Sequence, residues 1–306
     1  MKETIKSILR PVITSIRKYE YRILGLIAPK TLASVLYKSC YHRKLNWENP
    51  TDIDEKINWL KFNTDTSRWI DLADKYKVRD YVKECGLSHM LVKLYGKWDS
   101  VDAIDWDVLP QQFVMKTNNG SGNILICRDK EKLDKKAWVD KFKKMLSQGF
   151  GLDQAELHYN KIKPCVIAEE LLDNSKQDIE SSSLIDYKIW AFNGKPEYIW
   201  VCYNRTSHSC FVKVYDLDWQ AHPEYSVDCE HYQLSEIDIP RPKSFESMLE
   251  AAAKLSKGFS VVRVDLYEVD GKAYFGEMTF TPAAGYNYFY TDDFLKILGE
   301  KANIEI

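Results

Sequence analysis

The 306-residue sequence lacks several features that would assign it directly to a class of protein. No stretch is apolar enough, for long enough, to span a bilayer, and no apolar core precedes a small-residue cleavage site. The cysteines include no CxxC pair, and an odd, unpatterned set predicts reduced thiols in a cytoplasm instead of a disulfide framework. We therefore expect a cytoplasmic protein. The seven scattered cysteines are Cys40, Cys85, Cys127, Cys165, Cys202, Cys210 and Cys229.

Familiar catalytic and nucleotide-binding signatures are also missing. The chain has no GK[ST] ending of a P-loop and no GxGxxG in a βαβ setting, which argues against those two nucleotide-binding folds. No Ser/His/Asp or Cys/His set indicates a protein nucleophile. Asp216-Leu-Asp218 is only a weak, loop-placed match to a glycosyltransferase metal motif. A chemistry that needs no covalent enzyme intermediate is therefore favoured.

Composition indicates a globular chain with an unusual start. With 45% hydrophobic and 29% charged residues, the chain is long enough for two or three closely packed subdomains. Residues 1–44 carry ten Lys and Arg against Glu3 and Glu20, which makes this segment +8 and the remainder −10. The basic segment interleaves Ile, Leu and Val with its cations. Such a pattern is typical of helices on an anionic membrane surface. A basic helical hairpin packed on its own domain explains it more simply. The acidic body argues against nucleic-acid binding.

Apolar periodicity and turn residues predict alternating helices and antiparallel strands. We find no internal repeat, and the region after residue 203 is rich in loops until a helix near residue 244. This mixture predicts an α+β fold. The predicted helices begin near Pro50, where Ile53, Ile57 and Leu60 form a stripe, and cover residues 69–85, 131–148 and 244–257; the predicted strands cover 113–116, 124–127, 166–172, 187–192, 197–203, 261–269 and 273–280.

A small polar loop separates the first two predicted strands. Lys116 ends one strand, and Gly120 and Gly122 lie in the loop that follows. Glycines allow backbone N–H groups to turn toward an anion, and the lysine adds a point charge for phosphate oxygens. The same pattern also fits an ordinary hairpin turn, so the loop alone does not establish a phosphate site.

The hairpin near the end of the chain carries charged residues on one face. Arg263 and Asp265 share a face of one strand, and Glu277 and Thr279 share a face of the next. A two-residue turn at Asp270-Gly271 would send the two carboxylates to opposite faces. We expect instead a three-residue loop with Gly271 as the bulge, which keeps both on one face. Paired inward carboxylates indicate a metal or phosphate partner, although an edge hairpin with its polar face in water is the alternative.

The order of these motifs resembles the TupA-like family of the ATP-grasp superfamily, over about residues 45–306. The resemblance implies an ATP-grasp fold of two α+β subdomains that hold ATP between them. Its implied boundaries are a basic helical extension at 1–64, a nucleotide-binding subdomain at 65–173 and a metal-binding subdomain at 174–306. The motifs are DKYKVRDYV at 74–82, VMKTNNGSG at 114–122, IAEE at 167–170, DYK at 186–188, FNGKP at 192–196, VRVD at 262–265 and FGEMTF at 275–280.

The resemblance also implies residue roles in binding ATP and Mg²⁺. Thr279 stands where the superfamily usually has Asn, so a weaker or water-mediated metal ligand is expected there. The implied phosphate cations are Arg79, Lys116 and Lys188, with Arg263 beside the transferred phosphoryl group; the loop residues Asn119, Gly120, Ser121 and Gly122 would cover the β- and γ-phosphates; the hinge backbone of Glu169, Glu170, Leu171 and Leu172 would take the adenine, Asp186 the ribose, and Asp265 and Glu277 the metal.

The implied activity is an ATP-dependent ligation of a carboxylate and an amine through an acyl phosphate. Arg205, with His208 nearby, is a candidate for holding the acceptor carboxylate. The family resemblance suggests a uronic acid unit of a cell-surface polysaccharide as acceptor and an amino acid as amine donor. The alternatives are a phosphotransferase acting on a sugar or glycan, and a non-catalytic nucleotide-binding scaffold or glycosyltransferase-associated protein.

Overall fold

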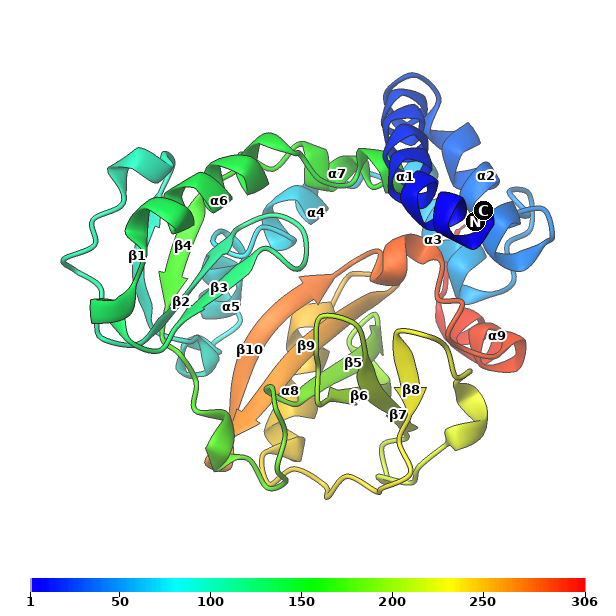
Figure 1. The fold of residues 1–306 in the computed structure, drawn as a ribbon. Coiled ribbons are helices and arrows are strands. Elements are labelled where there is room, and N and C mark those ends of the chain that lie inside the picture. The colour runs from blue at the N-terminus through cyan, green and yellow to red at the C-terminus, as the bar shows by residue number, and fades with distance from the viewer. Residues whose placement is uncertain (1, 306) are drawn as a thin grey trace.

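The computed structural model describes residues 2–305, with side chains from residue 15 onward, and it contains two β-sheets with helices around them (Figure 1). The smaller sheet has the strand order β1-β4-β2-β3 and the larger has the order β10-β9-β5-β6-β7-β8. Every pairing is antiparallel except that of β7 with β8. The predicted α+β class is confirmed.

The smaller sheet comes from residues 94–169. The helix α6 (Lys135–Ser147) packs on it, and Phe142 lies in a core with Phe113 and Met115. Asp134 caps this helix through the backbone N–H of Ala137. The strands of the smaller sheet are β1 (Leu94–Trp98), β2 (Phe113–Thr117), β3 (Ile124–Cys127) and β4 (Val166–Glu169).

The larger sheet forms the main core. The helix α8 (Phe245–Ser256) packs against β5, β6 and β9, and its buried face of Phe245, Met248 and Leu255 fills one side of the sheet. The other face turns toward the smaller sheet (Figure 1). The strands are β5 (Asp186–Phe192), β6 (Lys195–Tyr203), β7 (Cys210–Tyr215), β8 (Tyr232–Leu234), β9 (Val262–Val269) and β10 (Lys272–Thr279).

Further helices surround the two sheets, and of these α3 and α9 lie at the right-hand end of the molecule in Figure 1. The predicted stripe of Ile53, Ile57 and Leu60 is buried in the main core, and α3 packs on α9. These helices are α3 (Ile53–Asn63), α4 (Ser67–Leu72), α5 (Val78–Glu84), α7 (Leu157–Asn160) and α9 (Asp292–Lys301).

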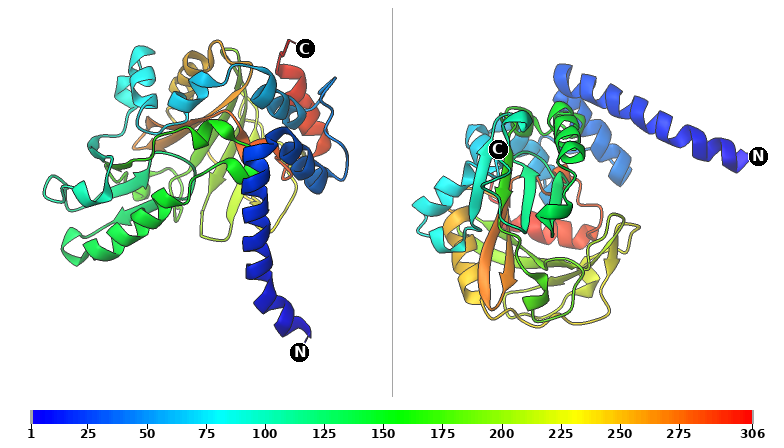
Figure 2. Two further views of the ribbon diagram at one scale, coloured as in Figure 1. Left: turned by 90° about the horizontal axis from the view of Figure 1, so that it is seen from above. Right: turned by 60° about the vertical axis from the view of Figure 1, so that its left-hand side comes forward.

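The basic start forms two helices with different surroundings. The first, α1 (Lys2–Ile27), projects away from the body, whereas α2 (Pro29–Tyr41) packs on it (Figure 2). Leu32, Leu36 and Tyr37 of α2 are buried. No helix within the described residues has the length and apolar content needed to cross a membrane.

Two local predictions are wrong. Residues 69–85 do not form one helix, because Asp74 accepts hydrogen bonds from the backbone N–H groups of Tyr76 and Lys77 and so interrupts it between α4 and α5. The expected three-residue loop at Gly271 is also absent. Asp270 and Gly271 form a two-residue turn with φ values of 53° and 68°, and Val269 pairs with Lys272.

Candidate active site

The larger sheet brings the predicted charged residues into two neighbouring rows. Lys188 on β5 pairs with Asp265 on β9, which pairs with Glu277 on β10. The next row joins Trp190, Arg263 and Thr279 in the same order. Directly paired residues in a sheet share a face. The register therefore sets two carboxylates and two cations side by side on rigid strands.

A β-bulge at Gly276 produces this register. The two-residue turn alone would place Asp265 opposite residue 276, but the pairing shifts between Phe275 and Glu277. A Cβ added at Gly276 would lie 2.8 Å from the backbone oxygen of Asp265, so a side chain there would force the strands apart. The bulge, not the loop, restores Glu277 to the face of Asp265.

The carboxylate of Asp265 is fully enclosed by cations. Arg263 donates from Nε to Oδ1 at 2.7 Å and from Nη2 to Oδ2 at 2.8 Å, and Lys188 Nζ lies 2.5 Å from Oδ2. Burial alone would lower the pKa of Lys188, but Asp186 and Asp265 raise it above its usual value. Both cations therefore remain charged inside the protein.

The carboxylate of Glu277 contacts a lysine that the sequence analysis did not select. Lys75, in the turn between α4 and α5, lies with Nζ 2.9 Å from Glu277 Oε2, and it donates to the backbone oxygen of Gly120 at 2.8 Å. Although burial raises the pKa of Glu277, Lys75, Lys188 and Arg263 together hold it well below its usual range. Lys75 thus links the larger sheet to the glycine-containing loop.

A third charged group lies on the smaller sheet. Arg79 Nη1 donates to Glu169 Oε1 at 3.0 Å, and Lys116 Nζ lies 2.5 Å from Glu169 Oε2. A second Arg79 donor reaches the backbone oxygen of Val92 at 2.7 Å. Two of the three predicted phosphate cations therefore converge on one buried carboxylate at the end of β4.

The loop at 118–123 is tied down at its start and open at its tip. Asn118 donates to Asp74 at 2.8 Å and accepts from the backbone N–H of Cys165 at 2.7 Å. Asn119 is buried, whereas Ser121 and Gly122 are exposed. Gly120 and Gly122 have φ values of 74° and 76°, which glycine adopts without strain.

Asp186 and Arg205 form the far end of the charged surface. Arg205 Nη2 donates to Asp186 Oδ2 at 3.2 Å, and Lys188 lies 3.3 Å from the same oxygen. The other oxygen, Oδ1, is buried without a hydrogen bond of normal geometry from the described residues, although the Asp186 carboxylate is close enough to Tyr267 to raise the pKa of its hydroxyl. His208 does not join this group, because it lines a separate cavity of about 370 Å³ with His231 and Tyr288.

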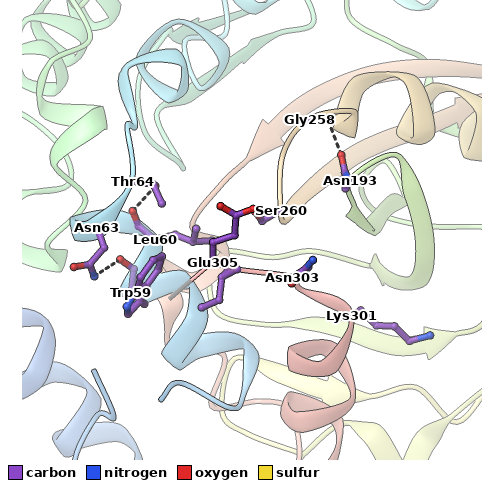
Figure 3. A pocket seen from close by; sticks show the side chains of 11 residues that line it. Trp59, Leu60, Asn63, Thr64, Asn193, Gly258, Ser260, Lys301, Asn303 and Glu305 are labelled. Atoms are coloured by element: carbon purple, nitrogen blue, oxygen red, sulfur yellow. Dashed lines mark hydrogen bonds between the residues drawn. The ribbon is translucent and has the colours of Figure 1, made fainter. Parts of the chain in front are cut away.

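The hinge residues follow β4 directly. The strand ends at Glu169, three residues before the predicted end at residue 172. The backbone N–H of Glu170 donates to the backbone oxygen of Lys93 at 2.9 Å. Leu171 and Leu172 are half-buried. A cavity of about 490 Å³ lies elsewhere, between Trp59, Asn193, Gly258 and Lys301, and none of the predicted site residues line it (Figure 3).

Within the described residues, ten charged side chains on or beside the two sheets make up what we call the site cluster. Its cations outnumber its carboxylates by six to four, so it suits a ligand with several negative charges, such as a polyphosphate. The cations are Lys75, Arg79, Lys116, Lys188, Arg205 and Arg263, and the carboxylates are Glu169, Asp186, Asp265 and Glu277.

The paired carboxylates also fit a divalent cation of the magnesium type. Asp265 and Glu277 supply hard oxygen donors on adjacent strands, and Thr279 lies with its hydroxyl 3.4 Å from Glu277. Among the described residues, no group of three or more His, Cys, Asp and Glu side chains is arranged to hold a metal ion. A metal bound here would therefore need ligand oxygens in addition, which is how Mg²⁺ is commonly held with phosphates.

Two α+β layers with a cation-rich surface between them define a protein of the ATP-grasp class. The profile of the TupA-like ATPgrasp family matches residues 55–303. With most of its length matched, the chain belongs to the TupA-like ATPgrasp family.

Several solved structures are similar to the chain at low sequence identity. The D-alanine–D-alanine ligase of Bacillus anthracis is 16% identical, with a TM-score of 0.40 over 76% of this chain and 67% of that one. The corresponding enzyme of Helicobacter pylori is 14% identical, with a TM-score of 0.41 over 81% and 68%. The L-amino acid ligase of Bacillus licheniformis is 13% identical, with a TM-score of 0.47, and the match covers 81% of this chain but only 55% of that enzyme. No curated protein matches the sequence.

Proposed function

We propose that the protein is an ATP-dependent carboxylate–amine ligase. The observation that carries this proposal is the six-to-four excess of cations in the site cluster, on opposed sheets of an ATP-grasp fold. An excess of positive charge held close together, much of it buried, is costly unless a more negative ligand binds. The triphosphate of ATP is such a ligand.

The proposed nucleotide contacts follow the chain in order. Arg79 and Lys116 bind phosphate oxygens once these compete with Glu169, and the loop residues Asn119, Gly120, Ser121 and Gly122 cover the phosphates. The backbone from Glu169 through Leu172 receives the adenine. The buried Oδ1 of Asp186, which lacks a hydrogen bond of normal geometry, supports its assignment to ribose, because a hydroxyl can donate to it.

Asp265 and Glu277 are the proposed Mg²⁺ ligands, with Thr279 as a weaker contributor. A bound Mg²⁺ would neutralise phosphate charge during phosphoryl transfer. Lys75, Lys188 and Arg263, which contact the two carboxylates in this structure, would then be available to phosphate oxygens. The cations would thus hold the carboxylates in the absence of nucleotide and hold the nucleotide in its presence.

The proposed chemistry needs no protein nucleophile. A carboxylate oxygen of the acceptor attacks the γ-phosphorus, the bond to ADP breaks, and an acyl phosphate forms. An amine then attacks the acyl carbon, loses a proton and expels phosphate to leave an amide. Arg263, Lys116 and Lys188 stabilise the negative charge on the transferred group, and Arg205, whose side chain is 37% exposed, binds the acceptor carboxylate.

We further propose a uronic acid unit of a cell-surface polysaccharide as the acceptor and an amino acid as the amine donor. The support is the family resemblance together with a basic N-terminal segment that suits work on a lipid-linked glycan at the inner face of the membrane. The domain boundaries at residues 64 and 173 also remain proposals.

Calorimetry with ADP and Mg²⁺ tests the nucleotide site. Wild-type protein should bind ADP with micromolar affinity, and Asp265→Asn/Glu277→Gln should weaken the Mg²⁺-dependent part at least tenfold, because the metal loses both carboxylates. Asp178→Asn/Glu246→Gln removes the same charge from two exposed ion pairs and should change nothing. A folded wild-type protein that binds no ADP would contradict the assignment as a working enzyme and favour a scaffold.

Product analysis then separates the ligase from a phosphotransferase. Phosphate release that requires both a uronic acid and an amine supports ligation. A stable phosphorylated sugar, formed without any amine, would replace the ligase by a phosphotransferase.

A further inference from the structure

The projecting helix α1 has one side that packs on the body. Tyr21 and Leu24 contact the cluster around Leu32 and Tyr37 of α2. Gly25 is buried, and a Cβ added there would lie 1.9 Å from the backbone oxygen of Leu152, so the glycine permits close contact with the segment before α7. This side fixes the direction in which the helix leaves the body (Figure 2).

The opposite side of α1 is apolar and exposed. Four large hydrophobic side chains occur at intervals of three or four residues along this side, with a fifth directly after the last, and we call this side the outer face. Their exposed fractions are large for such residues, and contiguous exposure of this kind marks an interaction surface. They are Ile16 at 54%, Tyr19 at 67%, Ile23 at 42%, Leu26 at 64% and Ile27 at 75%.

The sequence continues the same spacing toward the start of the helix. Ile5, Leu9 and Val12 precede Ile16 at intervals of four, three and four residues. At 100° per residue, these three positions and the five of the outer face occupy an arc of about 100°. Arg17 lies beyond one border of this arc and Arg22 beyond the other.

The second basic helix behaves differently. Leu32, Ala33, Leu36 and Tyr37 of α2 are buried in the body, so this helix is part of the folded domain. The two helices of the basic segment 1–44 therefore differ. The helix α2 packs on its own domain, as one of the two alternatives from the sequence expects, whereas α1 has an exposed apolar face. Deleting all 44 residues would remove core side chains as well as the free face.

Charge decides between the two surfaces that could cover the outer face. A second copy of the chain would bring two helices of net positive charge together. The positions beside a paired seam, where charged partners usually set the pairing, hold Ile8, Ile13 and Ile27 as often as the charged residues Lys6, Glu20 and Arg22. A bilayer with anionic lipids accommodates a wide apolar arc with Lys and Arg at its borders. The sequence of α1 fits the bilayer better.

We propose that the outer face of α1 binds the surface of an anionic membrane, with Ile16, Tyr19, Ile23, Leu26 and Ile27 inserted among the lipids and the exposed Arg17 at the headgroups. This inference deepens the proposed location of the enzyme and does not depend on its nucleotide chemistry. It assigns the contact to one face of one helix. The remainder of the protein stays in water, with α2 as its fixed attachment to the helix.

Co-sedimentation of the full chain with vesicles tests the inference. Wild type should bind phosphatidylcholine–phosphatidylglycerol vesicles at least tenfold better than phosphatidylcholine alone, and high salt should weaken the binding. Ile16→Glu/Ile23→Glu should abolish it. Val108→Glu/Ile237→Glu places the same charges at residues of the body that are 52% and 54% exposed, and it should bind as wild type does.

Two further measurements keep the result interpretable. Binding of ADP should be the same in wild type and Ile16→Glu/Ile23→Glu, which shows that the variant is folded and separates this inference from the nucleotide proposal. Sedimentation equilibrium should show a monomer for both. If wild type is a dimer, the variant is a monomer and neither binds vesicles, the membrane proposal is wrong and the outer face binds a second copy of the chain. Equal vesicle binding by both proteins would also overturn the membrane proposal.

Discussion

Two groups of buried carboxylates lie close together in this molecule and are compensated in different ways. In the site cluster, each carboxylate contacts one or more Lys or Arg side chains. In the second group, which we call the α3 network, most partners are neutral donors and the two cations are outnumbered. The α3 network comprises Asp52, Asp54, Glu55 and Glu156 with Arg43 and Lys61.

The neutral partners of the α3 network complete its hydrogen bonding. Asp54 accepts from Tyr41 and from the backbone and side-chain nitrogens of Asn287 at 2.6 and 2.5 Å. Glu156 accepts from Thr281 at 2.5 Å. Burial raises the pKa of Asp54 to about 6 and that of Glu156 to about 7. These carboxyls lack the excess of cations that surrounds Glu277.

The α3 network holds a strained loop. After β10, Ala283, Ala284 and Gly285 follow one another with φ values of 48°, 58° and 79°, a conformation that costs free energy for the alanines. Lys61 donates to the oxygen of Ala284 at 2.5 Å, and Asn58 to that of Gly285 at 2.9 Å. Comparison of the two groups teaches that neutral donors balance a carboxylate used for structure, whereas excess cations mark a site for an anionic ligand.

Removing one cation from the site cluster should give the largest effect. Lys75→Met keeps the length of the side chain but leaves Glu277 with fewer positive neighbours and releases the carbonyl of Gly120. We expect the Kd of Mg–ADP to rise on the order of 10–100-fold, because the variant loses a charged hydrogen bond, either to a phosphate or to the loop that covers it. Calorimetry measures it.

The matched control lies two residues further along the chain. Lys77 is exposed and pairs with Asp71 at 2.6 Å, so Lys77→Met removes the same charge without touching the site cluster. Nucleotide binding by this variant should equal that of wild type. Equal weakening by both substitutions would mean that net charge, and not the position of Lys75, determines affinity.

The sequence alone predicted much of the sheet framework but not the contacts that join its parts. The strands around Lys116 and the hairpin with Asp265 have strong apolar patterns, and their positions are confirmed. Lys75 was missed because its partners lie far away in the chain, and a lysine in a polar turn carries no local signal of burial. Its place in the motif DKYKVRDYV was the only available indication.

The register of the hairpin was predictable in outcome but not in cause. An isolated glycine inside a strand suggests a bulge, and Gly276 is such a residue. The sequence analysis placed the irregularity at Gly271, where the turn itself drew attention. A bulge at Gly276 and a three-residue loop at Gly271 both put Asp265 and Glu277 on one face. The side-chain pattern alone therefore could not distinguish the bulge from the loop.

The two groups of carboxylates should differ in how stability depends on pH. Because the folded-state pKa of Glu156 is raised from 4.5 to about 7, the unfolded chain loses this proton first, and stability falls as pH rises between these values. Glu156→Gln should remove this dependence of the unfolding free energy on pH, which amounts to a change on the order of 1–3 kcal/mol between the two pKa values. Urea unfolding at several pH values between 5 and 8 measures the difference.

Glu277 provides the opposite case in the same experiment. Its folded-state pKa is lowered by Lys75, Lys188 and Arg263 despite burial, so its contribution is complete above its unfolded pKa of 4.5 and is lost only as pH falls below that value. Glu277→Gln should therefore shift stability by a constant amount from pH 5 to pH 8. For Glu156, the contradicting outcome is a free energy of unfolding that depends on pH in the same way in wild type and in Glu156→Gln. Glu156 would then be ionised like a surface carboxyl.

The smallest effect is expected at Thr279, which borders the site cluster without carrying charge. Its hydroxyl lies 3.4 Å from Glu277 Oε1, a long contact that leaves the oxygen available to a metal. Thr279→Val preserves shape and removes the oxygen, so the Mg²⁺ concentration for half-maximal ADP binding should rise a few-fold, roughly the value of one neutral ligand. Thr279→Asn, which restores the residue usual in the superfamily, should lower it by a similar factor. If both variants titrate with Mg²⁺ as wild type does, Thr279 is a structural residue of β10 and the metal relies on Asp265 and Glu277 alone.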